Sequence, residues 1–151
     1  MKYATRRRRD SITKRRNDED KTASLTAELL VLSEISKRTG TPLREIAFSY
    51  GAHGKPYLKD GGLWFSLSHT RGAVCAAFGD AADGEIGVDI ELGSRRVSRG
   101  LYERTLSDAE RSAVNSAEDF IRVWVQKEAF LKRAGIGLAA GLKGADYGIR
   151  S

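Results

Sequence analysis

The sequence predicts an α+β protein, because helical patterns near both ends of the chain enclose a run of short strand patterns. Over residues 20–39, leucine and isoleucine recur at spacings of three and four, which is the repeat of an amphipathic helix. Between residues 46 and 91, short apolar stretches alternate with glycine-containing turns, as strands do. Residues 119–135 then form a second and more apolar helical segment. The length of 151 residues is typical of one domain with a modest core.

The first elements follow from local signals in the sequence. Residues 1–19 are polar and basic, with RRRR at 6–9 and KRR at 14–16, so we expect a basic arm before a domain at 20–151. Gly40 should end the first helix, and Thr41-Pro42 should begin a short second one, because proline is favoured at the first helical position. We expect strands at residues 46–50, 64–68, 73–78 and 86–91, with a glycine-rich loop over 51–62.

The later helices have recognisable starts. Ser107-x-x-Glu110 and Ser116-x-x-Asp119 are capping-box patterns, in which a serine and an acidic residue satisfy each other's free amides. They predict one helix that begins near residue 107 and another that begins near residue 116. A basic loop at 93–100 should precede the first of them.

Composition limits the classes of partner. The net charge of +6 and the pI of about 9.6 favour anionic partners, which include nucleic acids, acidic proteins, membrane surfaces and phosphorylated small molecules. The lone Cys75 lies among small apolar residues and reads as a buried hydrophobe, so we expect no disulfide within the chain and a cytoplasmic location. The longest apolar run, residues 73–78, is too short to span a bilayer, and no signal peptide is visible.

Two carboxylates share one face of the strand expected at 86–91. Side chains alternate along a strand, so Asp89 and Glu91 point one way while Val88, Ile90 and Leu92 point toward the core. A pair of carboxylates on a rigid element suits a hard divalent cation. The alternative is a solvated acidic face on an edge strand, and spacing alone favours that alternative.

The helix at 119–135 carries charge where its neighbours are apolar. Trp124, Glu128 and Lys132 are spaced by four and share one face, with Lys127 beside them. A solvent-exposed ion pair does not account for these charges, because the surrounding positions are too apolar. A buried charge needs a partner, so we expect a shared cation for Glu128 and a phosphate for the lysines.

Two further stretches carry weaker signals. His69 follows Ser68 at the end of a strand, where it is either a structural histidine or a phosphate contact. Gly54-Lys55-Pro56 places a lysine on a fixed loop, although such turns are common. The sequence contains no Walker A loop, no zinc cluster and no convincing serine–histidine–acid set.

Four motifs occur in a familiar order: G-K-P at 54–56, F-S-x-S-H at 65–69, G-x-D-x-E at 87–91 and W-x-x-K-E-A-x-x-K-x-x-G at 124–135. In these motifs the chain resembles a 4′-phosphopantetheinyl transferase of the surfactin-synthetase-activating (Sfp) type, over about residues 20–142. The resemblance implies the α+β fold of that family, with two pseudo-two-fold halves. These would be a first half at about 20–85 and an incomplete second half at about 86–151.

The resemblance also implies a reaction and a set of roles. Such enzymes transfer the phosphopantetheine arm of coenzyme A to a serine of an acyl or peptidyl carrier protein and release 3′,5′-ADP. By motif position, Asp89, Glu91 and Glu128 would hold Mg²⁺, and Glu128 would help to deprotonate the carrier serine. The residues implied to contact coenzyme A are Lys55, Pro56, Ser68, His69, Lys127 and Lys132.

Further expectations concern surfaces and alternatives. Arg95, Arg96 and Arg99 would form part of a carrier-docking surface. Family members continue for several strands beyond the last motif, so the resemblance implies a reduced form, a self-associating form or a fragment, with apolar surface on the helix at 119–135. The alternatives are a non-catalytic relic that binds coenzyme A or a carrier, and a nucleic-acid-binding protein supported by charge alone.

Overall fold

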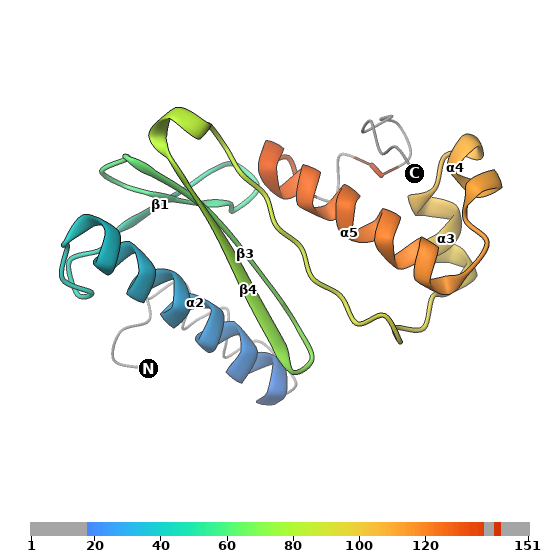
Figure 1. The fold of residues 1–151 in the computed structure, drawn as a ribbon, viewed down its shortest axis with the longest axis horizontal. Coiled ribbons are helices and arrows are strands. Elements are labelled where there is room, and N and C mark those ends of the chain that lie inside the picture. Colours follow the sequence, from blue (N-terminus) through green and yellow to red (C-terminus); the bar gives the residue numbers. More distant parts are fainter. Residues whose placement is uncertain (1–17, 138–140, 143–151) are drawn as a thin grey trace.

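Two bodies, joined by one extended segment, make up the described part of the chain (Figure 1). The computed structural model describes residues 18–137 and 141–142. The first body holds helix α2 (Asp18–Thr39), strands β1 (Phe48–Tyr50), β2 (Pro56–Leu58), β3 (Leu63–Thr70) and β4 (Ala73–Asp80), and the 3₁₀ turn η1 (Ala81–Asp83). The second holds helices α3 (Arg99–Thr105), α4 (Asp108–Ala113) and α5 (Ala117–Ala134). The predicted α+β class is confirmed.

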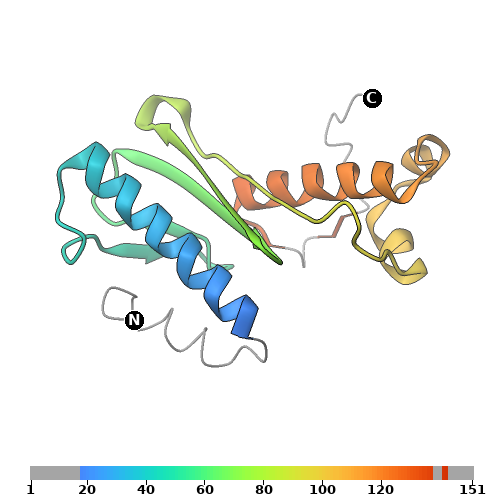
Figure 2. The same ribbon diagram turned by 60° about the horizontal axis from the view of Figure 1, so that its bottom comes forward.

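The first body is a helix packed on a β-hairpin. β3 and β4 pair antiparallel over their whole length, with Thr70 opposite Ala73, so that Arg71 and Gly72 alone form the turn. Gly72 has a positive φ of 74°, which glycine adopts without strain in such tight turns. α2 lies across one face of this hairpin in both views (Figures 1 and 2). The core between them consists of Val31, Leu32, Ile35, Ile46, Leu63 and Phe65.

Several predicted elements differ from those observed. Asp18 and Glu19 already belong to α2, and the remaining arm, with both basic runs, lies outside the described residues. Thr41-Pro42 does not begin a helix, because the chain makes a single turn in which the Glu45 amide donates to the Pro42 carbonyl at 2.8 Å. The loop expected at 51–62 contains β2, which pairs antiparallel with β1. α3 was not predicted as a separate helix.

The strand predicted at 86–91 is also wrong as a sheet element. This segment is extended but joins no strand among the described residues. Its backbone meets β3 through a side chain instead, since the Val88 amide donates to Ser66 Oγ at 3.1 Å. Val88 and Ile90 are only half-buried and Leu92 is exposed, so this set does not face the core as predicted.

The second body is built around α5. Both predicted serines cap helices, because Ser107 Oγ accepts from the Glu110 amide and Ser116 Oγ accepts from the Asp119 amide. The reciprocal capping box forms only at Ser107, since Asp119 accepts from the Asn115 amide instead of the Ser116 amide. α5 ends at Gly135, whose φ of 65° is the left-handed conformation common after helices. The core of this body comprises Leu106, Phe120, Ile121, Trp124, Leu131 and Leu142.

A buried lysine joins α5 to its neighbours. Lys127 is fully buried, and its ammonium group donates to the Thr105 carbonyl at 2.7 Å, to Glu110 Oε2 at 2.6 Å and to the Leu142 carbonyl at 2.9 Å. The charge is therefore matched by three acceptors, as a buried ammonium requires.

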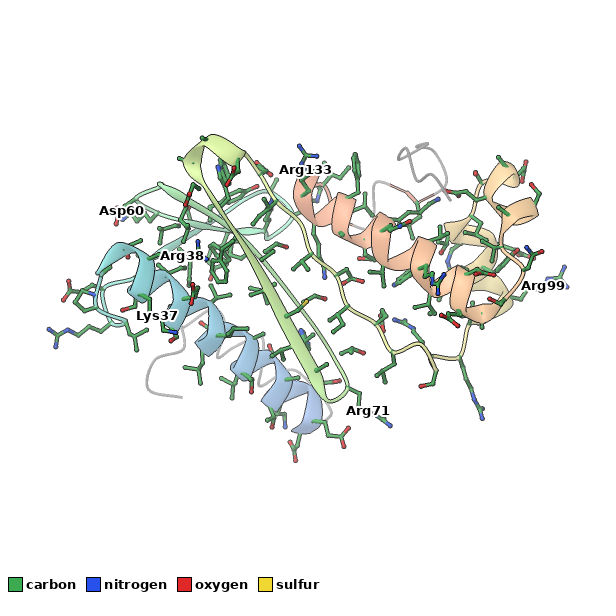
Figure 3. The ribbon with its side chains drawn as sticks, in the orientation of Figure 1. Lys37, Arg38, Asp60, Arg71, Arg99 and Arg133 are labelled. Atoms are coloured by element: carbon green, nitrogen blue, oxygen red, sulfur yellow. The ribbon has the colours of Figure 1, made fainter. Side chains whose placement is uncertain are left out.

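The extended segment at 84–98 runs beside α5 in both views (Figures 1 and 2). Gly87 makes this approach possible, because a Cβ at that position would lie 2.5 Å from the Arg133 amide nitrogen and closer still to the Ala129 carbonyl oxygen. Figure 3 shows Arg133 at the end of α5 that meets this segment, where its Nε donates to the Glu85 carbonyl at 3.0 Å. The glycine of the G-x-D-x-E motif therefore has a packing role.

We predict that Gly87→Ala destabilises the protein by at least about 2 kcal/mol, because the new methyl group meets helix backbone that cannot rotate away. Gly93→Ala is the matched control, since a Cβ at Gly93 has nothing within 4 Å. The free energy of unfolding, measured in urea by circular dichroism, checks this. Equal stabilities for the two variants would contradict the packing role of Gly87.

We predict that Lys127→Met costs about 3–5 kcal/mol, because it leaves Glu110 without its charged partner and two carbonyl groups without donors. Arg122→Met on the same helix should cost less than about 0.5 kcal/mol, since Arg122 forms an ion pair with Glu118 in which both side chains are exposed. Urea unfolding of both variants is the measurement. A Lys127→Met loss as small as the Arg122→Met loss would rule out the anchoring role.

The Glu110 carboxylate should make stability depend on pH. Burial tends to raise the pKa of Glu110, but hydrogen bonds from Lys127 and from the Ser107 amide outweigh it and lower the pKa. The folded protein thus binds this proton less tightly than the unfolded chain. The stabilisation is complete above the unfolded pKa of about 4.3 and is lost as the pH falls through the folded pKa.

We therefore predict that Glu110→Gln is less stable than the unmodified chain at neutral pH, and that this deficit shrinks as the pH falls below about 4. Urea unfolding over a series of pH values tests the sign. A deficit that stays constant across the series would show that the charge of Glu110 is not the cause.

Candidate active site

The side chains predicted for the site meet where the extended segment passes between β3 and α5. Lys132 Nζ donates to Asp89 Oδ1 at 2.5 Å and to Ser68 Oγ at 2.8 Å. Ser68 Oγ in turn donates to Asp89 Oδ1 at 2.7 Å. The structure therefore brings together three predicted residues from three motifs that are far apart in the sequence.

β3 presents one row of hydroxyl groups to the segment. Ser66, Ser68 and Thr70 alternate along the strand, which places them on the same face. Ser66 holds the Val88 amide, Ser68 holds Asp89, and Thr70 Oγ1 lies 3.4 Å from Glu91 Oε2. This row fixes the direction in which Asp89 and Glu91 point, although the segment is not a strand of the sheet.

Two carboxylate oxygens of the site are buried without a hydrogen-bond partner among the described residues. They are Asp89 Oδ2 and Glu128 Oε1. Burial raises the pKa of Glu128 and the charge of Asp89 raises it further, while Lys132 and Arg95 partly offset both effects. The two carboxylates are therefore close enough to repel each other, and a buried pair of this kind favours a bound cation.

Glu91, the third predicted metal ligand, is held differently. Its Oε1 forms an ion pair with Arg95 Nη1, and its Oε2 makes the long contact with Thr70. Within residues 18–137 and 141–142, no three carboxylate, histidine or cysteine side chains are gathered as a metal-binding group. Asp89 and Glu128 thus have free oxygens for an ion, whereas Glu91 is already paired.

A cavity of about 380 Å³ lies beside these groups. It is bounded by the Gly-Lys-Pro loop on one side and by α5 on the other. Gly135 lies where the two meet, since a Cβ there would lie 3.4 Å from Lys55 Cδ of the loop and 3.0 Å from Tyr57 Oη of β2. The lining includes Gly54, Lys55, Pro56, Ser66, Glu128 and Lys132.

Lys55 lines this cavity but its ammonium group is already engaged. Its Nζ donates to Glu85 Oε2 at 2.8 Å and to the Arg133 carbonyl at 2.6 Å, and only 10% of the side chain is exposed. In this structure Lys55 thus ties the loop to the end of α5.

Two predicted cofactor contacts are not brought to the cluster. Lys127 is fully buried and faces α3 and α4, so the cofactor contact predicted for it does not fit the structure. His69 follows Ser68 on β3 and pairs with Val74 of β4. Because neighbouring side chains on a strand point to opposite faces, His69 points away from the row formed by Ser66, Ser68 and Thr70.

Sequence reasoning missed some residues around the site. His53 lines the cavity next to the Gly-Lys-Pro loop, and the only sequence signal for it was its position directly before Gly54. Ser66 and Thr70 were not selected either, although their spacing of two from Ser68 placed them on the same face.

The family model and the known proteins that match this chain all carry the same name, 4′-phosphopantetheinyl transferase. Residues 85–147 match the model of the 4′-phosphopantetheinyl transferase superfamily. The 4′-phosphopantetheinyl transferase ffp of Bacillus subtilis is 32% identical over 146 residues, which cover 92% of this chain and 63% of that protein. The transferase Sfp of Bacillus subtilis strain 168 is 29% identical over the same shares. AcpT of Escherichia coli K12 is 35% identical over 105 residues, which cover 64% of this chain and 52% of that protein.

The chain spans between about half and two thirds of the length of these relatives. The matched region includes the segment that carries Asp89 and Glu91 and the helix that carries Glu128 and Lys132. Two of the four motifs, at 87–91 and 124–135, thus lie inside the matched region. The predicted resemblance is confirmed: the chain is similar to the 4′-phosphopantetheinyl transferase superfamily and to its Sfp-type members.

Proposed function

We propose that this chain is a Mg²⁺-dependent transferase that moves 4′-phosphopantetheine from coenzyme A to a serine of an acyl or peptidyl carrier protein. The observation that carries this proposal is the pair of buried, unpartnered carboxylate oxygens of Asp89 and Glu128 beside the ammonium group of Lys132. Such a site suits a cation and a phosphate together. The relatives are named 4′-phosphopantetheinyl transferases, which supports the same activity here.

The ligands proposed for Mg²⁺ are Asp89, Glu91 and Glu128. Carboxylate oxygens are the donors that this hard cation prefers, and two of the three side chains have an oxygen that is buried and unpaired among the described residues. When bound, Mg²⁺ supplies charge neutralisation for a pyrophosphate group.

Binding of coenzyme A falls to the cavity and its basic edge. Lys132 is 31% exposed and lines the cavity, so its ammonium group can face a pyrophosphate while it keeps its ion pair with Asp89. Lys55 and Pro56 line the same cavity and would contact the adenosine end. Ser68, which accepts from Lys132, is proposed at the phosphates. His69 is proposed there on its motif position alone, since it turns away from the hydroxyl row. Lys127 is left out of this proposal because its three acceptors already surround it.

The proton transfer is assigned to Glu128. In the reaction, the serine oxygen forms a bond to the phosphorus that carries pantetheine, and the bond from that phosphorus to 3′,5′-ADP breaks. Glu128 accepts the serine proton, directly or through water. Lys132 then stabilises the negative charge on the departing bisphosphate.

Three further parts of the proposal concern the domain halves, the cellular location and self-association. We propose two halves that divide near residue 85, which the two separate cores support. A cytoplasmic location is supported by the free thiol of Cys75. No helix in the described ranges is long and apolar enough to cross a membrane. Self-association remains a proposal, supported by the exposed side chains of Phe130 and Ile136.

The test is a carrier mass-shift assay. We expect the purified chain, with Mg²⁺ and coenzyme A, to add one phosphopantetheine group to an apo carrier protein from a panel of acyl and peptidyl carriers, as read by intact-mass spectrometry. Glu128→Gln should lower the rate at least about 100-fold, because it removes the proposed base and a metal ligand.

Two controls make the result decisive. Glu128→Gln should remain folded, since it removes a buried charge, and a melting curve checks this. A known transferase must modify the same carriers. Full activity in Glu128→Gln would refute its role, and coenzyme A binding without transfer would identify a non-catalytic binding protein.

A further inference from the structure

Arg95 occupies a central place beside the carboxylates, although no motif selected it for the site. Its Nη1 forms an ion pair with Glu91 Oε1, and its guanidinium carbon lies 5.5 Å from the centre of the Trp124 ring. Its charge also tends to lower the pKa of Glu128, which places it near that side chain. Arg95 therefore faces the proposed metal ligands from the segment that carries two of them.

The ion pair with Arg95 makes the bonding of Glu91 different from that of the other two carboxylates. Asp89 and Glu128 each keep one buried oxygen without a partner among the described residues, whereas Glu91 uses one oxygen for Arg95 and the other for the Thr70 contact. The Glu91 side chain is 17% exposed, so the ion pair is shielded from water more than a surface pair is. A metal ion can gain Glu91 only by replacing one of these contacts.

We propose that Arg95 competes with the divalent cation for Glu91. The guanidinium group is the counter-ion of Glu91 in the metal-free protein, and it gives up this carboxylate when the ion binds. This inference rests on the proposed function, because it takes Asp89, Glu91 and Glu128 as the metal ligands.

The ring of Trp124 makes this exchange feasible. A guanidinium group over an indole face is stabilised by a cation–π contact, so Arg95 keeps one favourable partner when it loses Glu91. Because the ion pair must break, the metal-free state is favoured and the affinity for the metal is lower than the three carboxylates alone would give.

Arg96 provides a matched control. It is the next residue, carries the same charge and is exposed, and within the described ranges it forms no ion pair with Asp89, Glu91 or Glu128. Replacing either arginine removes one positive charge from the same segment. Any difference in metal affinity between the two variants therefore reports the specific contact of Arg95 with Glu91 rather than the loss of one positive charge from the segment.

The experiment is a calorimetric titration of the full chain with Mn²⁺, without coenzyme A. We expect Arg95→Gln to bind Mn²⁺ about three- to tenfold more tightly than the unmodified chain, which is the scale of a partly exposed ion pair. Arg96→Gln should change the affinity less than about twofold, because it leaves the Glu91 pair intact. Arg95→Lys, which keeps the charge but not the planar fork, should lie between.

Repeating the comparison in the Glu91→Gln variant isolates the contact between Arg95 and Glu91. In Glu91→Gln the competed charge is gone, so adding Arg95→Gln should change Mn²⁺ affinity no more than adding Arg96→Gln does. Without metal, Arg95→Gln should also melt at a lower temperature than Arg96→Gln, and added Mn²⁺ should raise its melting temperature more.

The outcomes separate this inference from the proposed function. If Glu128→Gln binds Mn²⁺ as well as the unmodified chain does, the metal site itself is misplaced and both proposals fail. If Glu128→Gln loses Mn²⁺ binding but Arg95→Gln binds no more tightly than Arg96→Gln, the metal site stands and the competition by Arg95 is overturned.

Discussion

The ion pair between Lys132 and Asp89, with Ser68 bonded to both, is the contact on which the candidate site depends. It joins α5, the extended segment and β3, and no backbone ladder links these three pieces among the described residues. A buried ion pair stabilises a protein only where its remaining atoms are also satisfied, yet Asp89 Oδ2 has no partner there. The same contact thus assembles the site and leaves part of its bonding capacity for a ligand.

The balance of charge explains why this arrangement favours first a cation and then an anion. Within the described residues, the carboxylates of Asp89, Glu91 and Glu128 face the cations of Lys132 and Arg95, which leaves an excess of negative charge in a partly buried place. A divalent ion would reverse that sign, because it adds two positive charges. The basic groups would then be available to a polyphosphate that the carboxylates alone repel.

The sequence predicted the local elements well and their pairing less well. The helix N-caps at Ser107 and Ser116 and the spacing of Glu128 and Lys132 depend on neighbours in the chain, so local rules identified them. The segment at 86–91 has the alternation of a strand, but whether it pairs depends on distant residues. Here the hydroxyl groups of β3 and the bare backbone of Gly87 decide the outcome, and no local pattern reports either.

The two lysines of α5 lie on different faces of the helix, and their positions explain why Lys127 is structural while Lys132 is part of the candidate site. Each residue turns the helix by about 100°, so Glu128 and Lys132, four apart, share a face, whereas Lys127 is rotated by about 100° from Glu128. That rotation directs Lys127 into α3 and α4, where Glu110 neutralises it, and leaves Lys132 at the cavity. α5 therefore carries two sets of charge for different reasons: buried Lys127 anchors the helix within its own body, and Lys132 binds Asp89 and Ser68 at the candidate site.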